Sequence, residues 1–271
     1  MGRECGITNT TTKTGKVKRI VSIQDVMDFS FCPKFFDHRK NNERTLMHEY
    51  NNAIERSYFK YLEELIQAPD KVSNAFERLK TAWGNEWIKE KDFRSIQIMP
   101  TNPNFDTYSL KRRAGIYSIT NFYSLMKRDI QFPIAVNKSY TVNLYDNVFI
   151  TGSWDYIREI SANPKNKIQI VKFLKEENRR CAIIQDRNDL DIIAMCYAFD
   201  KCFGVDYETI IFDTHCKAPR QYSIIPRTQK DYDLLINSVK SYIYCIDNNI
   251  SLMSPSQICG ICEYKNKCFI R

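Results

Sequence analysis

Residues 256–268 read Ser256-Gln257-Ile258-Cys259-Gly260-Ile261-Cys262-Glu263-Tyr264-Lys265-Asn266-Lys267-Cys268. Two residues separate Cys259 from Cys262, a spacing that lets neighbouring thiolates bind one metal centre from a single turn. Cys268 follows on a polar and charged segment that should fold back as a short loop. Three thiolates leave one position of a four-cysteine site open, so a fourth ligand is expected elsewhere in the chain.

Cys32 is the best candidate for that fourth ligand. It lies in Phe29-Ser30-Phe31-Cys32-Pro33-Lys34-Phe35-Phe36, whose aromatic residues would exclude water from a metal site. Zinc accepts four cysteines readily, but usually from two local pairs, whereas an iron–sulfur cluster is larger and accepts ligands from distant segments. More than 200 residues separate Cys32 from the other three cysteines, which favours iron–sulfur and leaves zinc as the alternative.

The other cysteines are scattered among apolar or tail residues, and we interpret most of them as small buried hydrophobic side chains. They are Cys5, Cys181, Cys196, Cys202, Cys216 and Cys245. A disulfide framework is a poor explanation for them, because residues 1–18 form a Thr-, Lys- and Gly-rich stretch unlike a signal peptide. We therefore expect an intracellular, cytoplasmic protein.

The composition predicts a folded protein with affinity for polyanions. Of the 271 residues, 43% are hydrophobic, enough for a substantial core, and no run approaches the roughly 20 apolar residues that cross a bilayer. The net charge of +8 suits DNA or RNA, although ordinary solubility explains it equally well. The richness in Lys, Asn, Ile and Tyr is typical of an AT-rich genome, and a viral protein in a host cell is one interpretation.

Three basic groups are candidates for contacts with phosphates. They are Lys111-Arg112-Arg113, Lys172 with Lys175, and Arg179-Arg180. A solvated surface is the alternative for each of them.

Periodicity divides the chain into a helical part and an α/β part. Residues 1–20 read as a flexible basic tail, and Ser22 with Asp25 has the pattern of a helix N-terminus. Helical spacing of apolar residues predicts a helical subregion at about 44–130. Its expected helices span 44–67, 74–90 and 109–129.

Alternating patterns predict an α/β core at about 134–250. Strands are expected at 135–144, 147–157, 168–174, 207–213 and 221–225, and helices at 188–203 and 231–248. The order strand–strand–strand–helix–strand is typical of a mixed sheet with helices on its flanks. Residues 256–271 form the C-terminal cysteine segment.

One cysteine followed by Pro-basic-Phe-Phe near the start, with Cys-x₂-Cys-x₅-Cys at 259–268, resembles the iron–sulfur members of the RecB-type PD-(D/E)XK nucleases. These include the CRISPR-associated RecB-like exonucleases and the C-terminal nuclease domain of AddB. The resemblance runs from about 21 to 271. It implies a single domain with a restriction-endonuclease-like core, and a [4Fe–4S] cluster on Cys32, Cys259, Cys262 and Cys268 that joins the N- and C-terminal segments.

The resemblance also implies a site for Mg²⁺ or Mn²⁺. Gly152-Ser153-Trp154-Asp155 is similar to the family's Gly-x-x-Asp segment, which makes Asp155 the expected metal ligand. The next strand of the family carries an acid and a lysine two residues apart, on one face. Here that strand reads Ile168-Gln169-Ile170-Val171-Lys172-Phe173-Leu174-Lys175, with Lys172 either at the acid position or as the catalytic lysine.

In both registers the second carboxylate is missing. Glu176 and Glu177 lie just beyond the strand and are the nearest replacements. A lysine facing Asp155 could instead form an ion pair in the place of the metal.

Two further positions depart from the family pattern. The helix that carries Gln-x-x-x-Tyr in the family reads Ile193-Ala194-Met195-Cys196-Tyr197, which keeps only the tyrosine. Asn51 stands where the family often has histidine, with His48 one turn earlier. The site is therefore expected to be degenerate.

Three functions remain open at this point. The first is a non-cleaving iron–sulfur protein that binds DNA, single-stranded or at ends, or a DNA-processing protein partner. The second is an active Mg²⁺- or Mn²⁺-dependent DNA exonuclease with a rearranged site. The third is a structural subunit of a larger assembly, viral assemblies included.

Overall fold

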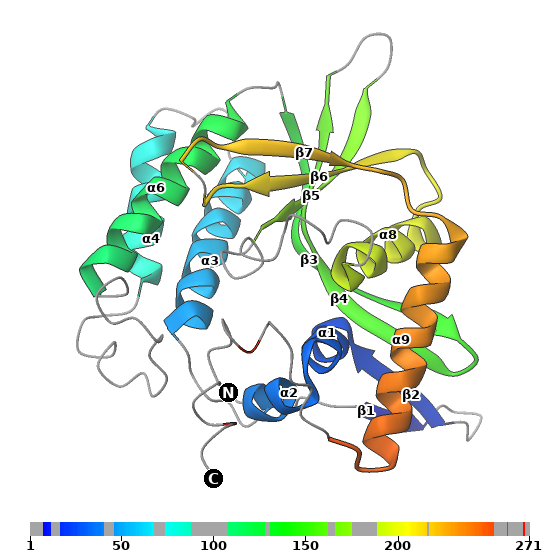
Figure 1. Cartoon of the computed structure of the whole chain (residues 1–271). Helices are drawn as coiled ribbons and strands as arrows, with labels where there is room; N and C mark the ends of the chain where they lie inside the picture. The colour runs from blue at the N-terminus through cyan, green and yellow to red at the C-terminus, as the bar shows by residue number, and fades with distance from the viewer. Residues whose placement is uncertain are drawn as a thin grey trace.

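The computed structural model shows a curled mixed β-sheet with helices packed on both faces (Figure 1). It describes residues 8–11, 17–40, 46–67, 74–87, 108–127, 131–161, 166–174, 189–215, 217–251, 259 and 268.

The sheet follows the order β1-β2-β4-β5-β6-β7, and β3 pairs with β4 beside this path. The strands are β1 Thr8–Thr11, β2 Val17–Ser22, β3 Gln131–Tyr145, β4 Val148–Ile160, β5 Lys167–Phe173, β6 Tyr207–Asp213 and β7 Arg220–Ile224. A tight turn joins β3 to β4, where Asp146 has a φ of 42°. Asp and Asn tolerate this left-handed conformation better than most residues, which explains why the alternating pattern breaks there.

The strand β4 forks the sheet. Its first part, residues 148–151, pairs in parallel with β2, and its last part, residues 156–160, pairs antiparallel with β5. Between these two partners, residues 152–154 pair with β3 only, among the strands that the structure describes, and Asp155 follows them before the pairing with β5 begins. The Gly-x-x-Asp segment therefore lies where the sheet opens.

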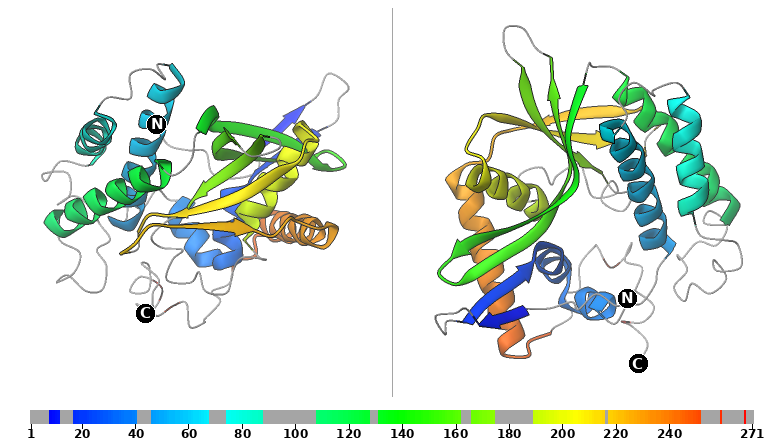
Figure 2. Two further views of the ribbon diagram at one scale, coloured as in Figure 1. Left: turned by 90° about the horizontal axis from the view of Figure 1, so that it is seen from above. Right: turned by 180° about the vertical axis from the view of Figure 1, so that it is seen from behind.

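Side chains alternate across the sheet and enter two hydrophobic clusters. On β5, Ile170 belongs to the cluster beneath α1, α8 and α9, whereas Val171 and Phe173 belong to the cluster beneath α3, α4 and α6. The layers are visible in Figure 2. The helices are α1 Ile23–Phe31, α2 Pro33–Lys40, α3 Leu46–Gln67, α4 Ala75–Glu86, α6 Tyr108–Met126, α8 Leu190–Cys202 and α9 Gln229–Asp247.

The mixed α/β sheet flanked by helices confirms the fold class at this level. One expectation for the N-terminal region was wrong in part. Residues 1–20 were expected to form a flexible tail, but Thr8–Thr11 and Val17–Ser22 form strands; β2 pairs with β4, and β1 extends the sheet by pairing with β2. Helix α2 was not predicted, because its eight residues show little separation of apolar and polar side chains. No helix in the described ranges is long and apolar enough to span a bilayer.

Two helical glycines should respond oppositely to alanine. A Cβ on Gly115 of α6 would lie 2.1 Å from Trp83 Cζ2 of α4, whereas a Cβ on Gly84 of α4 would meet no atom within 4 Å. We expect Gly115→Ala to lower the free energy of unfolding by about 1–3 kcal/mol through overpacking. Gly84→Ala should raise it by about 0.5–1 kcal/mol, because alanine favours the helix. Urea unfolding measures both, and equal effects would contradict the close α4–α6 packing.

Candidate functional site

Asp155 and Lys172 face each other at the fork, where the ladder between β4 and β5 ends. The last backbone pair joins Tyr156 to Val171, so Asp155 and Lys172 come next on the two strands. Lys172 Nζ donates to Asp155 Oδ1 at 3.1 Å, and the backbone N–H of Phe173 donates to Asp155 Oδ2 at 2.9 Å. Both oxygens of a carboxylate that is only 4% exposed are thus engaged by β5.

A second carboxylate reaches Lys172 from helix α8. Asp191 Oδ2 lies 2.6 Å from Lys172 Nζ. The position of Asp191 is set by Asp189, the N-cap of α8, whose Oδ1 accepts from the backbone N–H groups of Asp191 and Ile192 at 3.0 and 3.3 Å. Lys172 therefore bridges a strand aspartate and a helix aspartate.

The electrostatics favour a charged lysine. Burial alone opposes the charge of Lys172, but Asp155, Asp191 and Glu55 of α3 outweigh that effect and raise its pKa well above the usual range. Carboxylates outnumber the cation, so burial together with Glu55 and Asp191 raises the pKa of Asp155, although Lys172 lowers it. The pKa of Asp189 is likewise raised by burial and by Asp191.

Gly152 and Tyr140 lie opposite each other on β4 and β3, in the segment of β4 between its pairings with β2 and β5. A Cβ on Gly152 would lie 2.5 Å from the Tyr140 hydroxyl oxygen and 2.9 Å from Ile23 Cγ2 of α1. Glycine is needed here because β3 and α1 both approach this point closely. The buried Tyr140 hydroxyl has no hydrogen-bond partner among the described residues, and burial together with Asp191 raises its pKa.

The residues present do not fit a Mg²⁺ or Mn²⁺ ion at Asp155. Hard cations need free carboxylate oxygens, and here the Lys172 ammonium lies between Asp155 and Asp191 while a backbone N–H holds the remaining Asp155 oxygen. An ammonium group compensates part of the carboxylate charge, with one positive charge where a divalent cation has two, and it cannot act as a Lewis acid.

Sequence reasoning missed Asp191 and Glu55. Asp191 follows Asp189 two residues later at the start of an apolar helix, a pattern that signals capping and also places a carboxylate on the first turn. Glu55 lies one helical turn after Asn51, so α3 brings a glutamate toward the site instead of the expected histidine or asparagine. Glu176 and Glu177, the acids considered earlier, lie outside the described residues.

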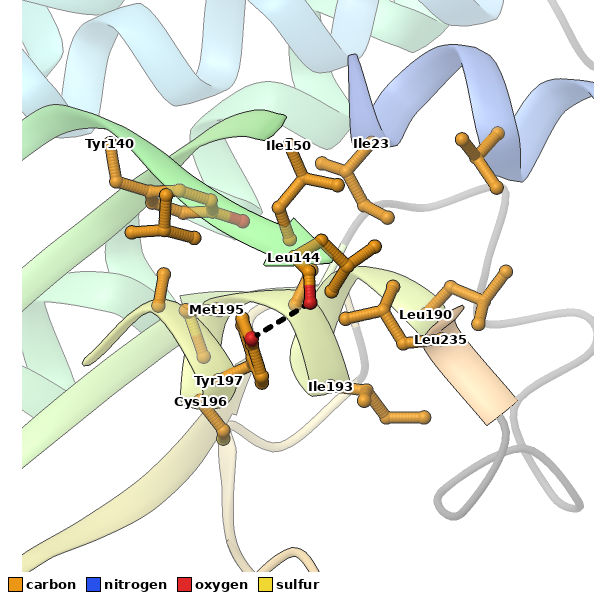
Figure 3. Packing of buried hydrophobic residues seen from close by; sticks show 14 of the residues in the cluster. Ile23, Tyr140, Leu144, Ile150, Leu190, Ile193, Met195, Cys196, Tyr197 and Leu235 are labelled. Atoms are coloured by element: carbon orange, nitrogen blue, oxygen red, sulfur yellow. Dashed lines mark hydrogen bonds between the residues drawn. The ribbon is translucent and has the colours of Figure 1, made fainter. Parts of the chain in front are cut away.

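The other family positions have structural roles. Ile193 is fully buried in the core beneath α8. The Tyr197 hydroxyl donates to the backbone carbonyl of Asn143 on β3 at 3.1 Å. It also lies 3.4 Å from the carbonyl of Leu144, a contact that Figure 3 shows. Tyr197 therefore ties α8 to the sheet. His48 Nε2 lies 2.9 Å from Asn52 Nδ2, one turn later on α3.

The basic groups are only partly on the surface. Lys111 is 4% exposed, with its ammonium 4.9 Å from the centre of the Tyr50 ring, and Lys172 is held by carboxylates. Neither ammonium group is open to a phosphate as expected, because Lys111 is buried and Lys172, 14% exposed, is engaged by two carboxylates. Arg112 and Arg113 are exposed on α6. Lys175, Arg179 and Arg180 lie outside the described residues.

The two ends of the chain meet around helix α2. Cys32 lies between α1 and α2 in an extended conformation, with φ −168° and ψ 125°. Ser251 Oγ donates to Asp37 Oδ2 at 2.5 Å, and Cys268 Sγ lies 3.7 Å from His38 Nε2. Segments more than 200 residues apart in sequence thus converge on one short helix.

Two of the four expected cluster cysteines, Cys32 and Cys259, act electrostatically on a third, Cys268. Burial raises the pKa of the Cys268 thiol, the charges of Cys32 and Cys259 raise it further, and Lys34 lowers it. Cys262 lies outside the described residues. Within those residues, no three His, Cys, Asp or Glu side chains form a group that could hold a metal ion. The four-cysteine site stays a prediction, and a donor set of thiols fits the chemistry of an iron–sulfur cluster.

The remaining cysteines are only partly as expected. Cys196 is buried, Cys245 is half-buried and Cys202 is exposed, so the interpretation as a buried hydrophobic side chain fits Cys196 and does not fit Cys202. Cys5, Cys181 and Cys216 lie outside the described residues.

No protein-family model matches the chain, and a comparison with curated proteins finds no match. The function is therefore inferred from the geometry at Asp155, Lys172 and Asp191 and from the cysteines near α2.

Removing Lys172 should cost much stability. Lys172→Met leaves Asp155 and Asp191 buried without their cation, and we expect a loss of about 3–5 kcal/mol at neutral pH. The loss should be smaller at pH 5 than at pH 8, because carboxylates with raised pKa values take up protons as the pH falls. Urea unfolding at several pH values measures this.

Lys138→Met, at an exposed position on β3, is the control and should stay within about 0.5 kcal/mol of the wild type. A Lys172→Met variant as stable as that control would mean that Lys172 does not hold the site together.

Proposed function

We propose that this protein is a non-cleaving iron–sulfur protein with a PD-(D/E)XK-type core that binds DNA. The observation that carries the proposal is the Lys172 ammonium, which lies 3.1 Å from Asp155 Oδ1 and 2.6 Å from Asp191 Oδ2. In a metal-dependent nuclease of this type, a divalent cation would occupy the space beside Asp155.

The order of elements supports this core. Three antiparallel strands, β3, β4 and β5, are followed by helix α8 and by β6, which pairs in parallel with β5. Asp155 and Lys172 lie on the two central strands of this arrangement. The resemblance assigns the metal-binding acid to Asp155, and it assigns Lys172 either to the second acid position or to the catalytic lysine.

The chemistry at the fork supports binding without hydrolysis. Hydrolysis of a phosphodiester needs a cation that accepts oxygen ligands from the phosphate and activates water. The Lys172 ammonium has its hydrogen bonds directed at two carboxylates and is 14% exposed. It joins β4, β5 and α8, but it cannot coordinate phosphate or water oxygens as a metal ion does.

The exposed surface of α6 is the best described candidate for the DNA contact. Arg112 and Arg113 are exposed and form no ion pair among the described residues, and Tyr117 is 67% exposed one turn later. Guanidinium groups bind backbone phosphates, and an exposed aromatic ring offers a face on which an unpaired base can stack. This combination favours single-stranded DNA.

One observation favours the second candidate, an active exonuclease with a rearranged site. Asp191 supplies a carboxylate close to Asp155, and Glu55 adds to the negative potential there. In that case Asp191 would replace the missing acid, and Lys172 would have to leave its present position for the metal to bind.

A cleavage assay separates the two candidates. We expect single-stranded DNA with Mg²⁺ or Mn²⁺ to be cut no faster by the wild type than by Asp155→Ala, because the metal position is filled by Lys172. Lys172→Glu, which restores an acid, should gain Mn²⁺ affinity in an EPR titration, and adding Asp155→Ala should abolish the gain. Wild-type cleavage that is lost in both Asp155→Ala and Asp191→Ala would establish the exonuclease instead.

The α6 surface should govern DNA affinity. Arg112→Ala and Arg113→Ala should each reduce the slope of log affinity against log salt by about 1, because each removes one phosphate contact. Tyr117→Ala should cost about 1–3 kcal/mol on single-stranded DNA. Fluorescence anisotropy across a salt series measures these effects, with the exposed Lys230→Ala on α9 as the control. Absence of DNA affinity even at low salt would favour the structural-subunit hypothesis.

A further inference from the structure

We propose that His38 is a positioning residue for the iron–sulfur cluster, donating an N–H···S hydrogen bond to Cys268 that raises the reduction potential and slows loss of the cluster. This inference rests on the cluster that belongs to the proposed function, and it adds a residue outside the four cysteines.

The geometry brings a ligand and a donor together on one helix. Cys32 immediately precedes Pro33, the first residue of α2, and its backbone carbonyl accepts from the N–H of Phe36 at 3.0 Å. His38 lies further along the same helix, and its Nε2 is 3.7 Å from Cys268 Sγ. One expected cluster ligand, Cys32, therefore immediately precedes α2, and a second expected ligand, Cys268, contacts His38 within the helix.

His38 is placed to give Cys268 a hydrogen-bond donor. Its Nε2 lies 3.7 Å from Cys268 Sγ, and a neutral imidazole carries one N–H group. Hydrogen bonds to the sulfurs of a cluster stabilise the more negative reduced form and so raise its reduction potential.

The position of α2 is itself fixed on the C-terminal side. Asp37, next to His38, accepts from Ser251 Oγ at 2.5 Å and lies 3.3 Å from Lys34 Nζ. These contacts hold α2 against the segment that follows α9, so the imidazole keeps its distance from Cys268. Outer contacts of this kind orient metal ligands and strengthen metal retention.

The test uses the full chain purified without oxygen, with His38→Ala, His38→Gln and Lys40→Ala compared with the wild type. Lys40 is exposed on the same helix, and glutamine keeps an N–H donor near the place of Nε2. Two readouts are needed, the reduction potential from a titration followed by EPR and visible absorbance, and the rate at which a chelator bleaches the cluster.

We expect His38→Ala to lower the potential and to bleach about 10-fold faster. His38→Gln should retain most of both properties, and Lys40→Ala should match the wild type. If His38→Ala equals the wild type in both readouts, or if Lys40→Ala changes them as much, the role of His38 is wrong while the cluster stands. Wild-type protein without iron and sulfide, or with zinc instead, would overturn the cluster and this inference together.

Discussion

A buried ammonium group held between two carboxylates is the interaction on which the functional part of this structure depends. Lys172 comes from β5, Asp155 from β4 and Asp191 from the first turn of α8. Removing these charges from water is costly, and the cost is recovered only while all partners stay in place. This contact therefore joins two strands and a helix.

The fork in the sheet makes this arrangement possible. Because β2 leaves β4 after residue 151 and β5 joins it only at residue 156, the intervening segment is open for side chains from α1 and α8. Gly152 lets Tyr140 and Ile23 approach, and Asp155 takes over the pairing of β5 through its side chain. A continuous ladder would have left no room for the site.

The N- and C-terminal regions are joined by several modest contacts. Arg19 of β2 forms a two-point ion pair with Asp247 of α9, with distances of 3.0 and 2.6 Å. Ser251 bonds to Asp37 of α2, close to Cys32. Partly exposed contacts of this type contribute little each, so a cluster shared by both regions would add the constraint that they lack.

The sequence by itself determined most helices and strands, and it singled out the candidate cluster cysteines and Asp155. Alternation and helical spacing predicted the sheet strands from residue 135 onward and the helices α3, α4, α6, α8 and α9 to within a few residues, because these segments carry apolar residues at strand or helix spacing or in continuous buried runs such as α8. Local spacing also singled out the cysteines and Asp155. The strands β1 and β2 were missed because pairing across the sheet, not local pattern, stabilises them, and helix α2 was missed because its residues show little separation of apolar and polar side chains.

Only the tertiary structure decided which charges meet. Nothing in the local sequence distinguishes Lys111 and Lys172 from exposed lysines. In the structure Lys111 is buried beside Tyr50, and Lys172 lies between Asp155 and Asp191. Asp191 lies 19 residues after Lys172 in sequence. It contacts Lys172 because the first turn of α8 packs beside β5. Contacts between distant segments depend on how the layers pack, and no local pattern encodes that packing.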